Sequence, residues 1–194
     1  MELRYLTREE IDKVKWNSCV HYANNGAVFG YMWFLDQLNK DWDAIVEGDY
    51  ESVMPLIWKK DRKRLYQPSL LPHVGIYSIN VLSPKRVENL LQVIPAHFKV
   101  IDIQLNDKSR PAEELGFEVS VVKHKYLPLN QPFEGLFDNF DPSLKASVQK
   151  AENIGLRPVS DLKPERLAEF YKRHNMKWGN LEFNFHALQR LMWN

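Results

Sequence analysis

Residues 42–60 read WDAIVEGDYESVMPLIWKK, and this stretch decides the fold. Apolar residues dominate two short runs, 42–47 and 52–60, on either side of Gly48-Asp49-Tyr50. Two such runs separated by a glycine-containing turn are typical of an antiparallel β-hairpin. Pro55 lies inside the second run. Because proline cannot donate to a strand ladder, it predicts a bulge or an unpaired edge there.

The residues before the hairpin predict one strand followed by two helices. Residues 3–6 (LRYL) are a short strand candidate. Thr7 and Glu10 have the spacing of a capping box, which predicts a helix over 8–22. Residues 29–38 are apolar almost all round, so they predict a second helix that is deeply buried or forms the wall of a cleft.

The residues after the hairpin alternate between strands and helices. A third strand is expected from residue 65 to 67, and residues 74–77 resume extended structure. Ser83-Pro84 predicts a helix start, with serine as N-cap and proline at the first helical position. Further predicted elements are a strand over 98–105, one helical turn over 111–115 and a long strand over 117–127.

A linker, PLNQP at residues 128–132, separates this set of elements from a second one. Asp141-Pro142-Ser143 starts a helix that ends at Gly155, and a strand over 156–160 is followed by helices over 164–175 and from 185. The order strand, helix, helix repeats that of the N-terminus, so we expect a second copy to begin near residue 156. In the alternative interpretation, the last two helices pack on the first domain.

The composition is that of a globular protein. The 194 residues carry 26 Lys and Arg against 25 Asp and Glu, and 12 % are aromatic. Balanced charge argues against a dedicated DNA-binding protein. No run approaches the roughly 20 apolar residues of a membrane span, and the N-terminus lacks a secretory signal. Since Cys19 is the only cysteine, no internal disulfide is possible, and we expect a cytoplasmic protein.

The order of these elements resembles the Gcn5-related N-acetyltransferase fold. Two such lobes joined by a helix are similar to the FemAB group of bacterial aminoacyltransferases. The likeness is carried by residues 42–50 (WDAIVEGDY), 53–56 (VMPL), 66–68 (YQP) and 75–78 (GIYS), and by KAE at 150–152 with GL at 155–156 in the joining helix. The joining helix departs from the group's pattern, because residues 146–149 (ASVQ) are not basic.

The resemblance implies an α/β fold class: an acyl-CoA N-acyltransferase-like lobe, with a mixed central sheet flanked by helices, plus the first elements of a second similar lobe. The expected domains are a lobe over 1–127, a linker and joining helix over 128–155, and an incomplete second lobe over 156–194. The C-terminal helices are expected to pack on a second lobe or subunit.

The implied function is transfer of an acyl or aminoacyl group to an amine acceptor. The donor in such a group is an acyl-coenzyme A or an aminoacyl-tRNA, and the acceptor a small molecule or a peptidoglycan-precursor-like compound. An alternative is a non-catalytic module of the same fold that binds a peptide or glycan. A third option is a complete small acetyltransferase with a diverged donor turn.

The sequence predicts that this lobe does not hold the donor itself. A coenzyme A site of this fold uses a glycine-rich turn whose backbone N–H groups bind the pyrophosphate. The corresponding residues 78–84 read SINVLSP, without glycine, and Pro84 removes an N–H. We therefore expect no cofactor bound by this chain, and the scattered histidines predict no metal site.

Three residues are the predicted substrate-binding side chains. Tyr66 and Gln67 precede a proline at the end of a strand, where a phenol and an amide can face a ligand, and Trp33 is a candidate for a cleft wall. No catalytic residue is assigned. Glu47 has the chemistry of a general base, but we prefer a hydrophilic turn there. The basic run Lys59–Arg64 is interpreted as a solvated turn.

Overall fold

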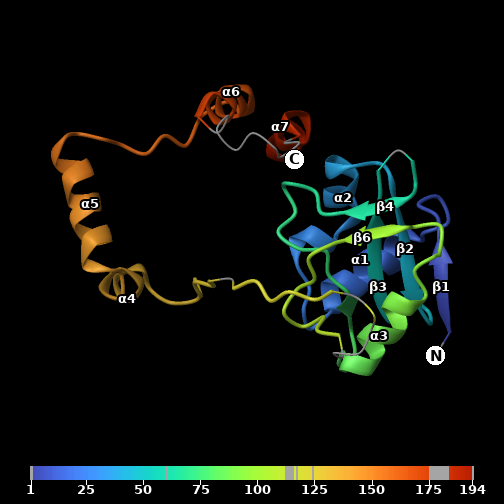
Figure 1. Cartoon of the computed structure of the whole chain (residues 1–194). Helices are drawn as coiled ribbons and strands as arrows, with labels where there is room; N and C mark the ends of the chain where they lie inside the picture. The colour runs from blue at the N-terminus through green and yellow to red at the C-terminus, as the bar shows by residue number, and fades with distance from the viewer. Residues whose placement is uncertain are drawn as a thin grey trace. The chain divides into compact units, whose positions relative to one another are not determined.

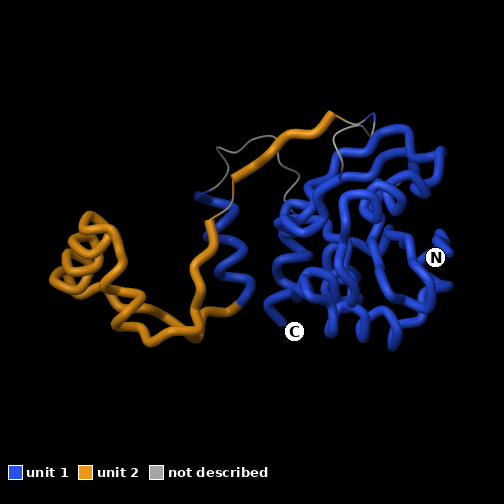
Figure 2. The backbone as a smooth tube through the Cα atoms, turned by 90° about the horizontal axis from the view of Figure 1, so that it is seen from below, with its two compact units in different colours: residues 1–117, 164–194 blue, residues 118–163 orange. Residues whose placement is uncertain are grey.

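A computed structural model describes residues 2–59, 61–111, 116, 118–123, 125–174 and 184–193. The chain divides into two compact units (Figure 2). Unit 1 comprises Met1–Phe117 together with Pro164–Asn194, and unit 2 comprises Glu118–Lys163. The chain is a mixed α/β protein, as expected.

The predicted hairpin forms the centre of a four-stranded antiparallel sheet in unit 1 (Figure 1). Its strands are ordered β1 (Leu3–Leu6), β2 (Trp42–Glu47), β3 (Ser52–Ile57) and β5 (Tyr77–Ser78). β2 and β3 pair along their whole length, from Trp42 opposite Ile57 to Glu47 opposite Ser52. All twelve residues of the two strands are buried, which explains why their sequence is nearly continuously apolar.

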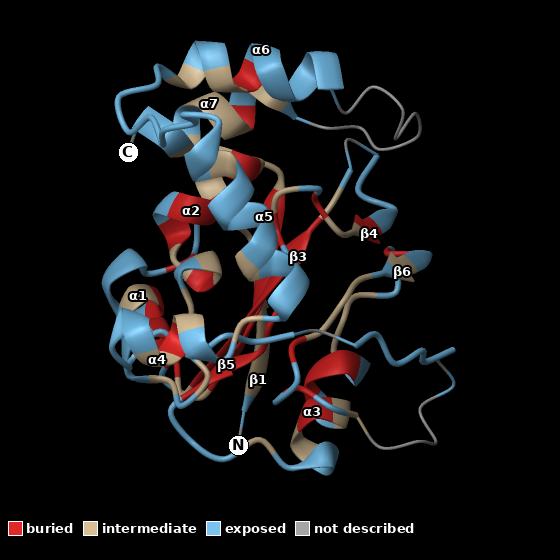
Figure 3. Ribbon diagram, turned by 90° about the vertical axis from the view of Figure 1, so that its left-hand side faces the viewer, coloured by how far each residue is buried: buried red, intermediate tan, exposed pale blue. Residues whose placement is uncertain are grey.

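A second, two-stranded sheet pairs β4 (Arg64–Tyr66) with β6 (Val100–Asp102) in parallel. On the side away from β2, the strand contacts of β3 lie near its two ends. At one end β5 pairs with Ser52 and Val53, and just past the other end Trp58 bridges to Leu65 of β4. Figure 3 shows β5 and the β4–β6 pair at separate places along β3. Between these contacts the β3 edge has no strand partner among the described residues.

Pro55 lies on that unpaired edge. The ladder to β2 runs through the Ala44–Pro55 pair without a bulge, so the missing N–H of Pro55 falls on the side away from β2. Of the two outcomes that Pro55 predicted, the structure has the unpaired edge.

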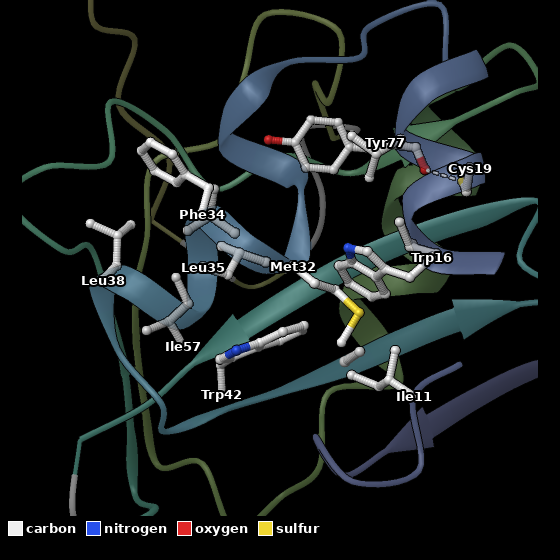
Figure 4. Packing of buried hydrophobic residues seen from close by; sticks show 14 of the residues in the cluster. Ile11, Trp16, Cys19, Met32, Phe34, Leu35, Leu38, Trp42, Ile57 and Tyr77 are labelled. Atoms are coloured by element: carbon white, nitrogen blue, oxygen red, sulfur yellow. Dashed lines mark hydrogen bonds between the residues drawn. The ribbon is translucent and has the colours of Figure 1, made fainter. Parts of the chain in front are cut away.

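One face of the sheet is covered by α1 (Lys13–Tyr22), the 3₁₀ turn η1 (Val28–Gly30) and α2 (Met32–Leu38). Figure 4 shows the core between them, in which Trp16 and Trp42 pack with ring centroids 5.2 Å apart. The Trp16 indole donates to the carbonyl of Gly30 over 2.8 Å, so this large ring is buried without an unsatisfied N–H.

The other face is covered by α3 (Pro84–Gln92). Ser83 caps this helix by accepting from the Arg86 N–H, and Pro84 occupies the first helical position, as predicted. Its stripe of Val87, Leu90 and Leu91 packs with Ile45 and other residues of the sheet. Since successive β2 residues point to opposite faces, both faces of the strand are buried in a core.

The helix predicted over 8–22 begins later than expected. Asp12 accepts hydrogen bonds from the N–H groups of Val14 and Lys15, so α1 starts at Lys13. Thr7 and Glu10 do interact, but in a separate turn in which the Glu10 carboxylate accepts from the Thr7 N–H and hydroxyl. The helix predicted over 29–38 is interrupted at Tyr31, whose backbone is extended between η1 and α2.

Several predictions for the C-terminal half are wrong or lie outside the described residues. The expected strand over 98–105 is reduced to β6, and the described residues of 117–127 and 156–160 are not in strands. Residues 112–115, most of the helical turn expected over 111–115, are outside the described part. The C-terminal helices within the described ranges are α4 (Phe133–Asp138), which was not predicted, α5 (Pro142–Asn153), α6 (Pro164–His174) and α7 (Phe185–Trp193).

The helix α7 packs on α2 in unit 1. Ala187 is fully buried within the same core cluster as Leu38, and the Asn184 amide donates to the Leu38 carbonyl. Trp193, at the end of α7, is largely exposed, and its indole donates to Glu165 of α6. The proposed beginning of a second lobe at residue 156 stays a prediction.

Candidate functional site

The predicted ligand-binding residues Tyr66 and Gln67 lie together at the end of β4. The Tyr66 hydroxyl accepts from the Asn39 amide over 3.2 Å, and the Lys59 ammonium lies 5.3 Å from the centre of its ring. The Gln67 amide donates to the Leu71 carbonyl and accepts from the Gln104 N–H over 3.1 Å. Gln67 therefore ties the 68–71 loop to the segment that follows β6.

Trp33 lies apart from this pair in its interactions. It belongs to α2, is 41 % exposed, and packs edge-on against Phe34 with centroids 5.6 Å apart. No hydrogen bond or ring contact joins Trp33 to Tyr66 or Gln67 among the described residues. The three predicted residues are therefore not gathered into one cluster.

The basic run Lys59–Arg64 is bound to the sheet at several points and is more than a solvated turn. Arg64 pairs with Asp102 over 2.9 Å. Arg62 places its guanidinium 4.6 Å from the centre of the Trp58 ring and also reaches Asp43. The Arg62 backbone has a φ of 52°, which is unusual for a residue with a side chain and follows from the tight turn Arg62 closes with the Lys59 carbonyl.

Asp43 is the centre of a polar cluster at one end of β2, on the α3 face of the sheet. The Tyr5 hydroxyl donates to Oδ2 over 2.6 Å, and the Arg8 backbone N–H donates to Oδ1 over 3.2 Å. The Arg62 Nη2 lies 3.2 Å from both oxygens. Burial of the phenol, its hydrogen bond to Asp43 and the negative charge of Asp43 all raise the pKa of Tyr5. The phenol therefore stays protonated and acts as a donor.

Next to this cluster, Arg8 makes a two-pronged ion pair with Asp36. Its Nε and Nη2 lie 2.9 and 2.6 Å from the two carboxylate oxygens, and the Trp42 indole adds a hydrogen bond of 2.9 Å. Burial alone would raise the pKa of Asp36, but these donors outweigh it and lower the pKa.

Glu47, at the opposite end of β2, is held by a second arginine. Arg86 of α3 donates through Nε and Nη2 over 2.6–3.0 Å, and the Ser52 hydroxyl donates over 2.6 Å. Burial opposes ionisation of Glu47, but the bonds from Arg86 and Ser52 prevail and lower its pKa. Glu47 is thus a buried, fully partnered anion, which corrects the expected hydrophilic turn and leaves it poorly suited to accept a proton.

The N-terminus of α3 is occupied by groups of the chain itself. The Ser83 side chain accepts from the Arg86 N–H, Pro84 has no N–H, and the Arg86 side chain is bound to Glu47 and to the Val81 carbonyl. Just before the helix, the Asn80 N–H donates to the Ser78 hydroxyl. Few N–H groups are left at the place where a donor pyrophosphate would bind.

Cys19 lies in the core, and its thiol donates to the Tyr77 carbonyl over 3.6 Å. Burial raises the pKa of the thiol to about 11. Because the thiolate is the reactive form, a packing role fits Cys19 better than a nucleophilic one. Within the described ranges, no three His, Cys, Asp or Glu side chains gather as a metal site requires.

Sequence reasoning did not single out the Asp43 cluster. The available signal was an aspartate inside the apolar run WDAIVE, at a strand position where a charge is costly unless it is paired. Its partners are Tyr5 and Arg8, near the N-terminus, and Arg62, in the turn before β4.

Comparison with protein-family models, curated proteins and solved structures finds no match to any of them. None of the helices in the described part of the chain is long and apolar enough to cross a lipid bilayer.

Proposed function

We propose that this chain is the N-terminal part of an N-acyltransferase that transfers an acyl or aminoacyl group to an amine. In this proposal the lobe formed by the first sheet contributes the acceptor side and holds no acyl donor. The donor, an acyl-coenzyme A or an aminoacyl-tRNA, is bound by a second lobe.

The order of elements supports the acyltransferase-like architecture. A strand, two helices and an antiparallel hairpin are followed by further strands around α3, and a parallel pair, β4 and β6, lies beside the main sheet. The predicted succession on which the resemblance to the acetyltransferase fold rests is matched from β1 to β6, whereas the described residues of its last strand, expected over 117–127, are not in a strand.

The observation that best supports a donor site outside the first lobe is the arrangement of groups at the N-terminus of α3. The Ser83 cap, the missing N–H of Pro84 and the salt bridge between Arg86 and Glu47 use the groups that would otherwise face a pyrophosphate. A complete acetyltransferase would need these groups for its donor.

Isothermal titration calorimetry with coenzyme A and acetyl-coenzyme A tests the donor half of the proposal. We expect no saturable heat at micromolar or low millimolar ligand. Micromolar binding to these 194 residues would assign the donor site to this lobe and contradict the proposal.

The acceptor half is tested with a peptide that has the stem sequence of a peptidoglycan precursor and one free lysine side-chain amine, and with the same peptide acetylated on that amine. We expect binding of the free amine and at least tenfold weaker binding of the acetylated peptide. Equal binding of the two peptides would favour the alternative, a peptide-binding module that does not select an amine.

A further inference from the structure

The strand β2 carries two buried acids on the same face, and each is paired with an arginine in a different way. Glu47 and Arg86 form a close pair: their side chains are 5 % and 13 % exposed, and Nη2 lies 2.6 Å from Oε2. Asp43 is even more deeply buried, with its side chain 1 % exposed, but its partner Arg62 is 47 % exposed.

The contact between Arg62 and Asp43 is also longer. One nitrogen, Nη2, lies 3.2 Å from each carboxylate oxygen, whereas a charge-assisted hydrogen bond is typically 2.7–2.9 Å. The pair lacks the two-nitrogen fork that Arg8 and Arg86 make with their own partners. Arg62 therefore neutralises Asp43 without being locked to it.

The Asp43 carboxylate is positioned independently of Arg62. Tyr5 donates to one oxygen and the Arg8 N–H to the other, so both oxygens keep their orientation if Arg62 moves away. A buried carboxylate that loses its cation is strongly destabilised, so the vacated place favours another cation.

The Trp58 ring adds an aromatic face beside this carboxylate. Arg62 lies 4.6 Å from the ring centre, within the range of a cation–π interaction. The Trp58 indole N–H is buried and has no hydrogen-bond partner among the described residues. A carboxylate next to an aromatic face is a combination that recognises organic cations.

We propose that Asp43 is the base of a binding site for a primary ammonium group, with Tyr5 orienting the carboxylate and Trp58 covering the cation. Arg62 occupies this site in the free chain and leaves when an amine binds. This inference rests on the proposed function, since the acceptor amine is the cation that the site takes. The site recognises the ammonium form and performs no chemical step.

The test is a titration of the ¹⁵N-labelled full chain with n-butylammonium chloride, followed by the NMR signal of the Trp58 indole N–H, which Trp58→Phe assigns. Sodium chloride controls for ionic strength, and N-butylacetamide controls for binding of the butyl group without the positive charge. We expect saturable shifts with the ammonium salt alone.

Two variants of the same turn sharpen the test. Arg62→Gln vacates the site and should lower the apparent Kd about tenfold, which is the gain expected for a competing side chain that fills a site about nine-tenths of the time. Lys63→Gln removes one positive charge from the neighbouring residue, which is exposed, and should leave the Kd within about twofold. Asp43→Asn should abolish saturable binding.

Equal Kd values for Arg62→Gln and Lys63→Gln, or no binding to either, would overturn the site. Circular dichroism melting of each variant identifies one that fails to fold. If Asp43→Asn is unfolded, the comparison of the two glutamine variants decides.

Binding of butylammonium without selection of the amine peptide would leave the site intact and reject the acceptor function. Amine-selective peptide binding that Arg62→Gln does not change would reject the site and leave the acceptor function intact.

Discussion

Arg86 of α3 grips both carboxylate oxygens of Glu47 on β2, with Nε 3.0 Å from Oε1 and Nη2 2.6 Å from Oε2. The two residues are 39 positions apart, and the pair fastens the start of α3 to the end of the central hairpin. The Ser52 hydroxyl completes the coordination of the carboxylate by donating to Oε2.

Removing the Arg86 side chain should therefore lower the stability of the folded chain. Arg86→Met leaves a buried, unpaired carboxylate, and we expect a loss of about 3–5 kcal/mol in the free energy of unfolding, measured by urea denaturation at pH 7. Lys85→Met is the matched control. Lys85 is exposed and pairs with Glu88 of the same helix, so its loss should cost about 0.5 kcal/mol or less. Similar losses for the two variants would contradict a special role of Arg86.

The stability of the chain should fall on acidification because the pKa of Glu47 is lowered in the folded state. Below the ordinary value of 4.5, the unfolded chain binds the proton and the folded chain resists it. The contribution of Glu47 is thus complete above pH 4.5 and is lost as the pH falls toward the lowered pKa. We expect the free energy of unfolding, measured by urea denaturation between about pH 3 and 7, to change less steeply with pH in Glu47→Gln than in the unmodified chain. Part of the pH dependence that is left in the variant comes from Asp36, whose pKa is also lowered. An unchanged slope would refute this assignment.

Gly30 should not tolerate a side chain, because a Cβ there would lie 2.6 Å from a ring carbon of Tyr77. Gly30→Ala is expected to lower the free energy of unfolding by about 1–3 kcal/mol through overpacking. Replacing the ring with the smaller side chain in Tyr77→Leu should reduce this penalty in the double variant. A double-mutant cycle with additive losses would show that the two residues do not clash.

Gln67 should contribute to stability through its two backbone contacts. Gln67→Leu leaves the Gln104 N–H and the Leu71 carbonyl without that partner, and we expect a loss of about 1–3 kcal/mol. Trp33→Ala is the comparison, because Trp33 is the other predicted binding residue and its exposed ring loses less on truncation. Native-like stability of Gln67→Leu would return Gln67 to the ligand-facing role predicted from the sequence.

The hairpin and α3 could be predicted from the sequence because local signals agree there. The Gly48 turn separates two apolar runs, and Ser83-Pro84 precedes a regular apolar stripe. The sequence does not locate the start of α1, because Thr7 and Asp12 are both good capping residues and the packing of Ile11 and Trp16 against the sheet selects the later one.

The expected strand over 117–127 shows the limit of pattern reasoning. Val119, Val121 and Val122 have strand propensity, but all three are exposed, and no described residue pairs with them. β-propensity reflects how side chains fit a sheet that other segments supply, so it cannot create a strand without a neighbour.

The candidate site was harder to predict than the fold. The side chains of Tyr66 and Gln67 have the chemistry to bind a ligand, but the sequence does not reveal that the Gln67 amide is used by Leu71 and Gln104. The opposite holds for Asp43, whose partners Tyr5 and Arg62 are brought to it only by strand pairing and by the turn before β4. Such contacts depend on tertiary structure.

The proline in β3 also bears on how the backbone of this strand is satisfied. A buried N–H that finds no acceptor costs free energy comparable to a lost hydrogen bond. Pro55 is buried, and on the side away from β2 the described residues supply no strand that could accept from it. Because proline has no N–H, this position leaves no buried donor without an acceptor, and the hairpin to β2 stays intact.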